Sequence, residues 1–341
     1  QQKIFFDFLR FCIGSAKEIP GSLKEVDWKE LYRIAQKQAL LGVLFHGIRQ
    51  LPKQLAPEQQ LLMQWMVMAE QIRKQNIRLF QDSVKVCQNF ENEGFANCIL
   101  KGQGNALLYP DPYMRTPGDI DIYLSGGRRK IMKYVEQVCP NQVMRYHHVD
   151  FPVMKTAIEV HFTPSYMFCP IHNLRMQKWF KEVMGEQCAH RVSLPDGYGE
   201  IHVPTATFNV IYILSHLYRH IFTEGIGLRQ LLDYYYVLIS DDLLLIRDRV
   251  QKELKHLGLW KFAQAVMFVV KVVFGLSENR MIAPMDEKEG WFLLDEIMRG
   301  GNFGQFDDRM GDKVDESKIH RYLRMNLRNL RFVKHYPTEA V

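Results

Sequence analysis

The feature that most constrains the fold is a short segment of strictly alternating polarity, Asp-Ile-Asp-Ile-Tyr-Leu over residues 119–124. Side chains two positions apart on a strand point to the same face of a sheet. The alternation therefore predicts a strand with Asp119 and Asp121 on one face and Ile120 and Ile122 in a core behind it. Helical periodicity surrounds this region, so the sheet must be small and covered by helices.

Helical patterns fill the first part of the chain. Asp27, followed three residues later by Glu30, has the layout of a capping box at a helix start. A second helix is expected to begin near Pro57 and to end at Gly94, because proline favours the first helical turn and glycine ends helices.

The chain after residue 204 is again helical in pattern. Four helices are expected between residues 208 and 274, followed by a loop and a last, basic helix over 317–334. The predicted fold class is therefore α+β, with a small mixed sheet between helical segments. The predicted division is an N-terminal helical segment (1–93), an α+β domain (94–203) and a C-terminal helical domain (204–341).

A second alternating segment, Ile-Glu-Val-His-Phe over 158–162, places Glu159 and His161 on one face. Two antiparallel strands, 143–151 and 154–162, are expected around Pro152. If the two acidic strands are neighbours, Asp119, Asp121 and Glu159 converge. Their repulsion is costly without compensation, and carboxylate oxygens suit Mg²⁺ (or Mn²⁺), with substrate phosphates completing the coordination shell. The same repulsion predicts that Asp121→Asn raises the stability of the metal-free protein.

A glycine-containing turn, Lys-Gly-Gln-Gly over 101–104, follows a predicted short strand at 98–100. Such a turn can bring backbone N–H groups close to a triphosphate. We therefore expect Lys101, Gly102, Gly104 and Arg115 to bind the nucleotide, with the two cations free to meet its phosphates.

Together these motifs resemble the core signature of an uncharacterised bacterial nucleotidyltransferase family of the DNA-polymerase-β-like superfamily. The segment at 158–162 looks like the strand that carries the third carboxylate of that family. The matching residues are Leu100-Lys101-Gly102, Leu107-Leu108-Tyr109-Pro110-Asp111-Pro112, Arg115 and Gly118-Asp119-Ile120-Asp121, with Trp28, Ala35, His216, His220, Gly227-Leu228-Arg229 and Asp233 outside the core.

The resemblance implies an enzyme that moves a nucleoside monophosphate from an NTP, ATP first among the candidates, to an unknown acceptor hydroxyl and releases pyrophosphate. Asp119, Asp121 and Glu159 would hold the metals, and Glu159 would also help to deprotonate the acceptor. The sequence departs from the superfamily at the turn, since Gly102 is followed by Gln103 where glycine or serine is usual.

A candidate acceptor pocket consists of His161, His216, His220, Arg229 and Asp233. His216 and His220 share one helix face, as zinc ligands would, but Leu217 stands where a zincin has glutamate. We expect these histidines to pack or hydrogen-bond where helices meet the sheet. Arg229 and Asp233 lie one turn apart, which predicts either an intrahelical ion pair or a lining of the pocket.

Composition limits the partners and the compartment. A net charge of +6 allows a polyanionic ligand without requiring one. The basic helix carries Arg321, Arg324, Arg328 and Arg331, and we expect a solvated face that binds no specific nucleic acid. Six scattered cysteines, no signal-peptide pattern and no apolar span predict reduced thiols in a cytoplasmic protein without a membrane segment.

Two other functions fit part of the pattern. A glycosyltransferase also uses Asp-x-Asp to hold Mn²⁺ and a nucleotide-sugar, although the region before the motif is short for that class. A catalytically silent nucleotide-binding or toxin–antitoxin-like module would keep the same residues and would bind NTP without turnover.

Overall fold

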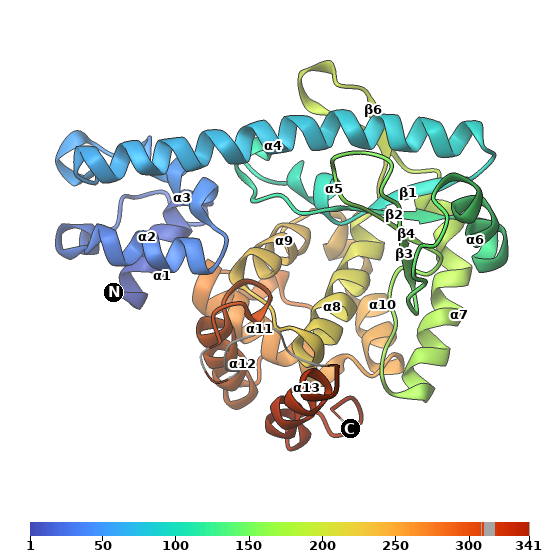
Figure 1. Cartoon of the computed structure of the whole chain (residues 1–341). Coiled ribbons are helices and arrows are strands. Elements are labelled where there is room, and N and C mark those ends of the chain that lie inside the picture. The colour runs from blue at the N-terminus through green and yellow to red at the C-terminus, as the bar shows by residue number, and fades with distance from the viewer. Residues whose placement is uncertain (308, 310–317, 341) are drawn as a thin grey trace.

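The computed structural model describes residues 1–307, 309 and 318–340, and the chain is mostly helical around a small sheet (Figure 1). Ser317, where the last helix was expected to begin, and the side chains of Arg321 and Arg324 lie outside the described part. Helix α4 (Gln59–Asn92) runs along one side of the molecule, with the N-terminal helices at one end and the sheet at the other. Those N-terminal helices are α1 (Gln2–Cys12), α2 (Trp28–Lys37) and α3 (Leu41–Ile48).

The central sheet has four strands in the order β1-β2-β4-β3. Strand β2 runs antiparallel to β1 and parallel to β4, and β3 pairs antiparallel with β4, so the sheet is mixed as predicted. Its core side includes Ile122 and Val160, both fully buried. The strands are β1 (Asn97–Leu100), β2 (Ile120–Leu124), β3 (His148–Asp150) and β4 (Ile158–His161).

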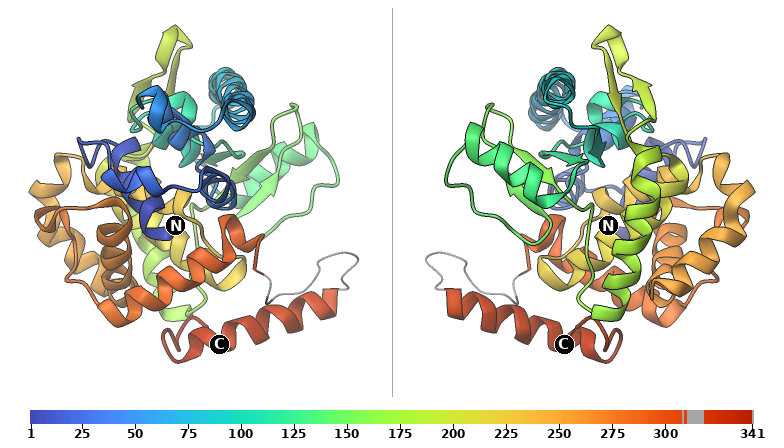
Figure 2. Two further views of the ribbon diagram at one scale, coloured as in Figure 1. Left: turned by 90° about the vertical axis from the view of Figure 1, so that its left-hand side faces the viewer. Right: turned by 90° about the vertical axis from the view of Figure 1, so that its right-hand side faces the viewer.

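The parallel pairing of β2 with β4 requires a long connection, which helix α6 (Gly127–Val138) and β3 supply. Figure 2 shows α6 and the sheet projecting on one side of the helical body. The antiparallel pairing before and after Pro152 is confirmed, but both strands are shorter than predicted. Proline lacks a backbone N–H and cannot continue a ladder. Asp119 lies one residue before β2 rather than within it.

The C-terminal part packs helices around α8 and α9, whose side chains are buried on nearly every face. The four helices expected between residues 208 and 274 are confirmed as α8 to α11, whereas α7 and α12 were not predicted. Short helix α5 (Gly102–Ala106) follows β1. The other elements are α7 (Pro170–Gln187), the hairpin β5 (Arg191–Ser193) and β6 (Glu200–His202), α8 (Ala206–Thr223), α9 (Leu228–Leu238), α10 (Asp242–His256), α11 (Trp260–Phe274), α12 (Glu287–Gly300) and α13 (Lys318–Val333).

Two hydrophobic cores hold these layers together. The larger joins α1, α2 and α3 to the C-terminal helices, through residues such as Phe5 on α1 and Tyr212 on α8. The smaller lies between the sheet, α6 and the second half of α4. Because one core contains both ends of the chain, the N-terminal and C-terminal helices form one packed body.

Local signals at the helix ends agree with the sequence. The Asp27 side chain accepts hydrogen bonds from the backbone N–H groups of Lys29 and Glu30, which confirms the predicted N-cap. Helix α4 begins two residues after Pro57 and ends two residues before Gly94. No helix in the described part of the chain combines the length and apolarity needed to cross a membrane.

Gly42 lets α3 approach the segment before β2 closely. A Cβ atom built on Gly42 would lie 2.2 Å from the backbone oxygen of Met114. We expect Gly42→Ala to lower the free energy of unfolding by about 1–3 kcal/mol, because a backbone atom cannot rotate away from the added methyl group. Denaturant unfolding followed by circular dichroism measures this change.

Gly185, on the exposed side of α7, is the matched control because a Cβ built there meets nothing within 4 Å. Alanine favours a helix interior, so Gly185→Ala should leave stability unchanged or raise it by up to ~1 kcal/mol. Equal effects of the two substitutions on the free energy of unfolding would show that the close approach at Gly42 does not exclude a side chain there.

Candidate active site

The two acidic strands are neighbours, so the sheet brings together the carboxylates that the sequence placed on separate segments. Asp121 on β2 stands opposite Glu159 on the parallel strand β4. Oxygens of Asp121 and Glu159 and a ring nitrogen of His161 all lie within 4.8 Å of one another. Asp119 lines the same cleft from its position just before β2. The expected convergence is therefore seen directly for Asp121 and Glu159.

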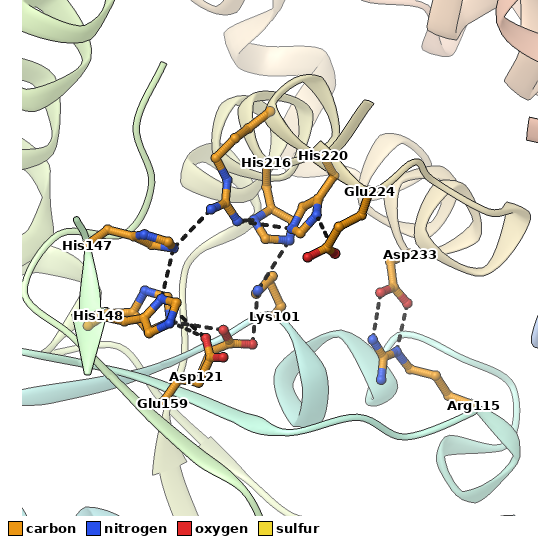
Figure 3. Close-up of polar contacts among 12 residues, drawn as sticks. Lys101, Arg115, Asp121, His147, His148, Glu159, His216, His220, Glu224 and Asp233 are labelled. Carbon is orange, nitrogen blue, oxygen red and sulfur yellow. Dashed lines mark hydrogen bonds and ion pairs between the residues drawn. The ribbon is translucent and has the colours of Figure 1, made fainter. Parts of the chain in front are cut away.

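Lys101 lies at the point where β1 passes into α5. Its backbone has a φ of 57°, unusual for a residue with a side chain, and it directs the ammonium group to the sheet face. The Nζ atom is 3.0 Å from Asp121 Oδ2 and 3.2 Å from His216 Nε2. Figure 3 shows Lys101 between the carboxylates and α8, so it links the sheet to the C-terminal helices.

His161 neutralises the other side of Asp121. Its Nε2 atom donates to Asp121 Oδ1 at 3.0 Å and lies 3.5 Å from Glu159 Oε2. Burial disfavours the charged imidazole, but the hydrogen bonds to the two carboxylates outweigh that cost and raise the pKa of His161. A residue expected in the acceptor pocket thus lies within the carboxylate cluster.

The three carboxylates differ in how they are compensated. Repulsion from Asp121 is the main cause that raises the pKa of Asp119 to about 6, with burial second. Burial opposes ionisation of Asp121, but the charge of Lys101 and the hydrogen bond from His161 hold its pKa well below the usual range. Burial also opposes ionisation of Glu159, whose pKa is nevertheless lowered by His161. Asp119 is the carboxylate that lacks sufficient compensation.

The structure adds a group that the sequence analysis missed, His147, His148 and Arg219. His148 Nδ1 lies 3.4 Å from Glu159 Oε2 and 3.1 Å from His147 Nε2. Arg219 Nη1 lies 3.1 Å from His147 Nε2 and Nη2 lies 3.0 Å from His220 Nε2. The adjacent His147 and His148 at the start of β3 were the available signal, since β3 pairs with the strand that carries Glu159.

These side chains line a cleft of about 600 Å³ between the sheet and α8. A smaller pocket of about 70 Å³ continues behind Lys101 towards α9. Asp119, Asp121 and Phe303 line both the cleft and this pocket.

The other residues predicted for the site lie at different places around these two pockets. Gly102 lines the smaller pocket, whereas Gly104 packs its Cα against Val203 and lines neither. His216 and His220 lie where α8 meets the sheet, as expected. Arg229 lies over the ring of Phe303 at 5.6 Å.

Arg115 is not free to meet phosphate in this structure, contrary to expectation. Its Nε and Nη2 atoms each donate to a carboxylate oxygen of Asp233 at 2.8 Å, and both side chains are buried (Figure 3). The Tyr109 hydroxyl donates to the same carboxylate at 2.7 Å. The partner of Asp233 is therefore Arg115, from the loop before β2, rather than Arg229 one turn away. This pair fastens that loop to α9.

The residues present fit a divalent cation with oxygen ligands. Asp121 and Glu159 supply ionised carboxylates, and the raised pKa of Asp119 shows a local excess of negative charge. A hard cation such as Mg²⁺ takes one or two carboxylates and completes its shell with water and phosphate. Asp119, Asp121 and Glu159 are the residues that would hold it.

Comparison with known proteins identifies one family. The model of a family described as "Uncharacterised nucleotidyltransferase" matches residues 24–275, which is well over half of the chain. The matched range contains every carboxylate, lysine and histidine of the cleft described above. Comparisons with curated proteins and with solved structures gave no match.

The buried pair of Arg115 and Asp233 generates a prediction about stability. We expect Asp233→Ala to lower the free energy of unfolding by about 3–5 kcal/mol, because it leaves the buried Arg115 guanidinium without its partner. Asp295→Ala is the control: it removes an exposed helical ion pair with Arg299, and about 0.5 kcal/mol or less is expected. Thermal and denaturant unfolding compare the two, and similar losses would contradict the assigned role of Arg115.

Asp119 generates a prediction about pH. Its pKa of about 6 lies above its ordinary 3.8, so the folded protein binds this proton more tightly than the unfolded chain. The resulting stability is complete below pH ~4 and is lost as pH rises through about 6. In chelator-treated buffer near pH 7.5, Asp119→Asn should therefore be about 1–3 kcal/mol more stable than the wild type, and near pH 4 the two should match.

Asp121→Asn is the matched comparison and should change stability in the opposite direction. Its carboxylate is compensated by Lys101 and His161, so neutralising it removes the charged partner of Lys101 and one of the two carboxylates that His161 contacts. The relief of repulsion predicted from the sequence for Asp121 thus belongs to Asp119. Unfolding curves in which Asp119→Asn loses stability at neutral pH would contradict this assignment.

Proposed function

The chain belongs to the uncharacterised nucleotidyltransferase family, and from this membership we propose that it transfers a nucleoside monophosphate from an NTP to an acceptor hydroxyl, with Mg²⁺ or Mn²⁺ bound. The observation that carries the proposal is the pairing of Asp121 with Glu159 across two parallel strands, with Asp119 in the same cleft. This geometry concentrates carboxylates at one end of a cleft large enough for a nucleotide.

The proposed reaction exchanges one phosphoester bond for another. The acceptor oxygen bonds to the α-phosphorus, the bond between that phosphorus and the bridging oxygen breaks, and pyrophosphate leaves with that oxygen. Divalent metal bound at the carboxylates supplies charge neutralisation for the phosphates and polarises the attacking oxygen. Asp119, Asp121 and Glu159 would position that charge, and the ionised Glu159 would accept the hydroxyl proton.

Two cations that line the cleft suit the leaving phosphates. Lys101 lines both the cleft and the smaller pocket, and its side chain retains 17% exposure. Arg219 lines the cleft from α8 and lies over the Tyr166 ring at 5.2 Å. We propose that these two residues contact the triphosphate, rather than Arg115, which is paired with Asp233. Gly102 would contribute backbone contacts at the smaller pocket, and we assign no contact to Gly104.

The acceptor is proposed to enter beside α8. His216, His220 and Arg229 lie on the helical side of the two pockets, facing the carboxylates across the open space. Asp233 is engaged with Arg115 and Tyr109, so its contribution to the pocket is to hold the loop in place. ATP is our first candidate for the nucleotide.

Of the rival functions, the glycosyltransferase lacks support from the comparisons, since the matching family is one of nucleotidyltransferases. A catalytically silent module is an outcome of the test. Incubation with α-labelled NTPs and cell extract, followed by identification of the labelled product, separates the proposed enzyme from the silent module. Binding of Mg²⁺·NTP without transfer of label to any acceptor would contradict the proposed enzyme.

The first prediction here separates catalysis from folding. Asp119→Asn should lower label transfer by roughly 100-fold or more, because a charge that positions the metal is lost. The same variant is expected to be the more stable protein at neutral pH, so unfolding cannot account for lost activity. Glu200→Gln, on the exposed hairpin strand β6, is the control and should transfer label like the wild type. Unchanged transfer by Asp119→Asn would remove Asp119 from the active site.

The second prediction concerns the metal. A non-hydrolysable NTP analogue should bind at least about tenfold more tightly with Mg²⁺ than with EDTA, because the carboxylates repel a bare triphosphate. Isothermal titration calorimetry under both conditions measures the ratio. The ratio should shrink in Asp119→Asn, where part of the repulsion is gone, and equal affinity in EDTA for the wild type would exclude metal-bridged binding.

A further inference from the structure

Three histidines gather beside the carboxylates at the edge of the sheet. His148 on β3 stands opposite His161 on β4, and the backbone oxygen of His147 accepts a hydrogen bond from the N–H of Phe162. Sheet pairing therefore fixes the positions of all three residues. The exposed fractions are 5% for His147, 7% for His148 and 1% for His161. One ligand nitrogen from each ring lies within 4.8 Å of those of the other two.

Each of these buried rings has one nitrogen without a hydrogen-bond partner in the described part of the chain. The atoms are His147 Nδ1, His148 Nε2 and His161 Nδ1. Buried polar atoms without partners are rare in folded proteins because each loses its hydration without compensation. The free nitrogens of His148 and His161 can each take a ligand from outside the protein chain. In His147, Nε2 accepts from Arg219, so Nδ1 carries the ring proton and Nε2 is the nitrogen that would bind a metal.

The hydrogen bond to a carboxylate orients the His161 ring so that its other nitrogen can bind a metal. The Nε2 atom of this ring donates a hydrogen bond to Asp121 and keeps this contact when the buried, unpartnered Nδ1 gives up its proton to bind a metal. Metal-binding histidines are commonly oriented in this way by a carboxylate on the opposite ring nitrogen. His148 Nδ1 hydrogen-bonds with His147 Nε2 at 3.1 Å and lies 3.4 Å from Glu159 Oε2, and its Nε2 is unpartnered.

We propose that His147, His148 and His161 bind one transition-metal ion of the Zn²⁺ class, in addition to the Mg²⁺ proposed at the carboxylates. Imidazole nitrogens favour Zn²⁺, Co²⁺ and similar ions, whereas Mg²⁺ prefers oxygen ligands. Three protein ligands leave a coordination position for water or a substrate oxygen. His147 and His148 line the cleft, so that position is accessible from it.

Arg219 is the cation closest to this group. Its Nη1 atom donates to His147 Nε2 at 3.1 Å, and its Nη2 atom also contacts His216 and His220 at 3.4 and 3.0 Å. Release of the His147 contact therefore leaves Arg219 with two partners on its own helix. Metal binding exchanges one of three contacts and does not leave the guanidinium unpaired.

The experiment uses Co²⁺ as the probe on the full chain. Chelator-stripped protein is mixed with Co²⁺ in excess Mg²⁺ and dialysed, and retained cobalt is measured by mass spectrometry and by visible absorption. We expect one equivalent retained by the wild type, and a tenfold or greater loss of affinity in both His147→Ala and His148→Ala. His256→Ala, an exposed histidine on α10, should match the wild type.

A second control addresses another group of candidate ligands, Cys169, His172 and Glu339, which also lie within 4.8 Å of one another. Glu339 there already accepts from the N–H groups of Phe168 and Cys169. Cobalt retention that falls in Cys169→Ser, with near-ultraviolet thiolate absorption, would overturn the assignment to the three histidines. Displacement by Mg²⁺, or equal retention in His148→Ala, would also overturn it.

Melting temperatures, measured with and without Co²⁺, test whether each variant is folded and whether the folded protein binds the metal. Co²⁺ should raise the melting temperature of the wild type, because it binds the folded state, and should not raise that of His148→Gln. This measurement does not involve nucleotide. The proposed metal site and the proposed nucleotidyl transfer are therefore tested independently of each other. A melting temperature that rises equally in both proteins would contradict the site.

Discussion

The contacts of Asp121 with Lys101 and His161 are the interaction on which the rest of the site depends. Asp121 is buried between two cationic partners at 3.0 Å on opposite oxygens. Lys101 extends the contact to His216 on α8, and His161 extends it to Glu159 on the neighbouring strand. A charge-compensated carboxylate at the centre thus fixes the relative positions of two strands, a turn and a helix.

That arrangement explains why the neighbouring carboxylates have different properties. Lys101 and His161 together stabilise the ionised form of Asp121, and His161 also favours the ionised form of Glu159. Asp119 is repelled by Asp121 and is left with a raised pKa. The site therefore retains a local demand for positive charge although cations surround it. We interpret this demand as the electrostatic basis for the divalent cation and the anionic substrate that we propose for this cleft.

The buried pair of Arg115 and Asp233 has a different role. It lies behind the cleft and joins the loop before β2 to α9, with Tyr109 on the same carboxylate. Because that loop ends at Asp119, its attachment to α9 determines where the first carboxylate enters the cleft. The helices that surround the sheet thus position the site as well as stabilise the fold. The larger core, which packs the first helices against the last, provides the rigid support that such positioning needs.

The sequence by itself determined the local elements and the family. Alternating polarity located β2 and β4, the Asp27 cap located α2, and the motifs between residues 100 and 162 identified a nucleotidyltransferase, because these signals depend only on neighbours along the chain. Only the tertiary structure decided which charges pair. Arg115 meets Asp233 across 118 residues, and Lys101 meets His216 across 115. Arg219 and His147 become neighbours only when α8 packs against the edge of the sheet. Spacing along the chain predicts a partner one helical turn away, such as Arg229 for Asp233, but a buried charge takes the partner with the best geometry in the folded protein, wherever that residue lies in the sequence.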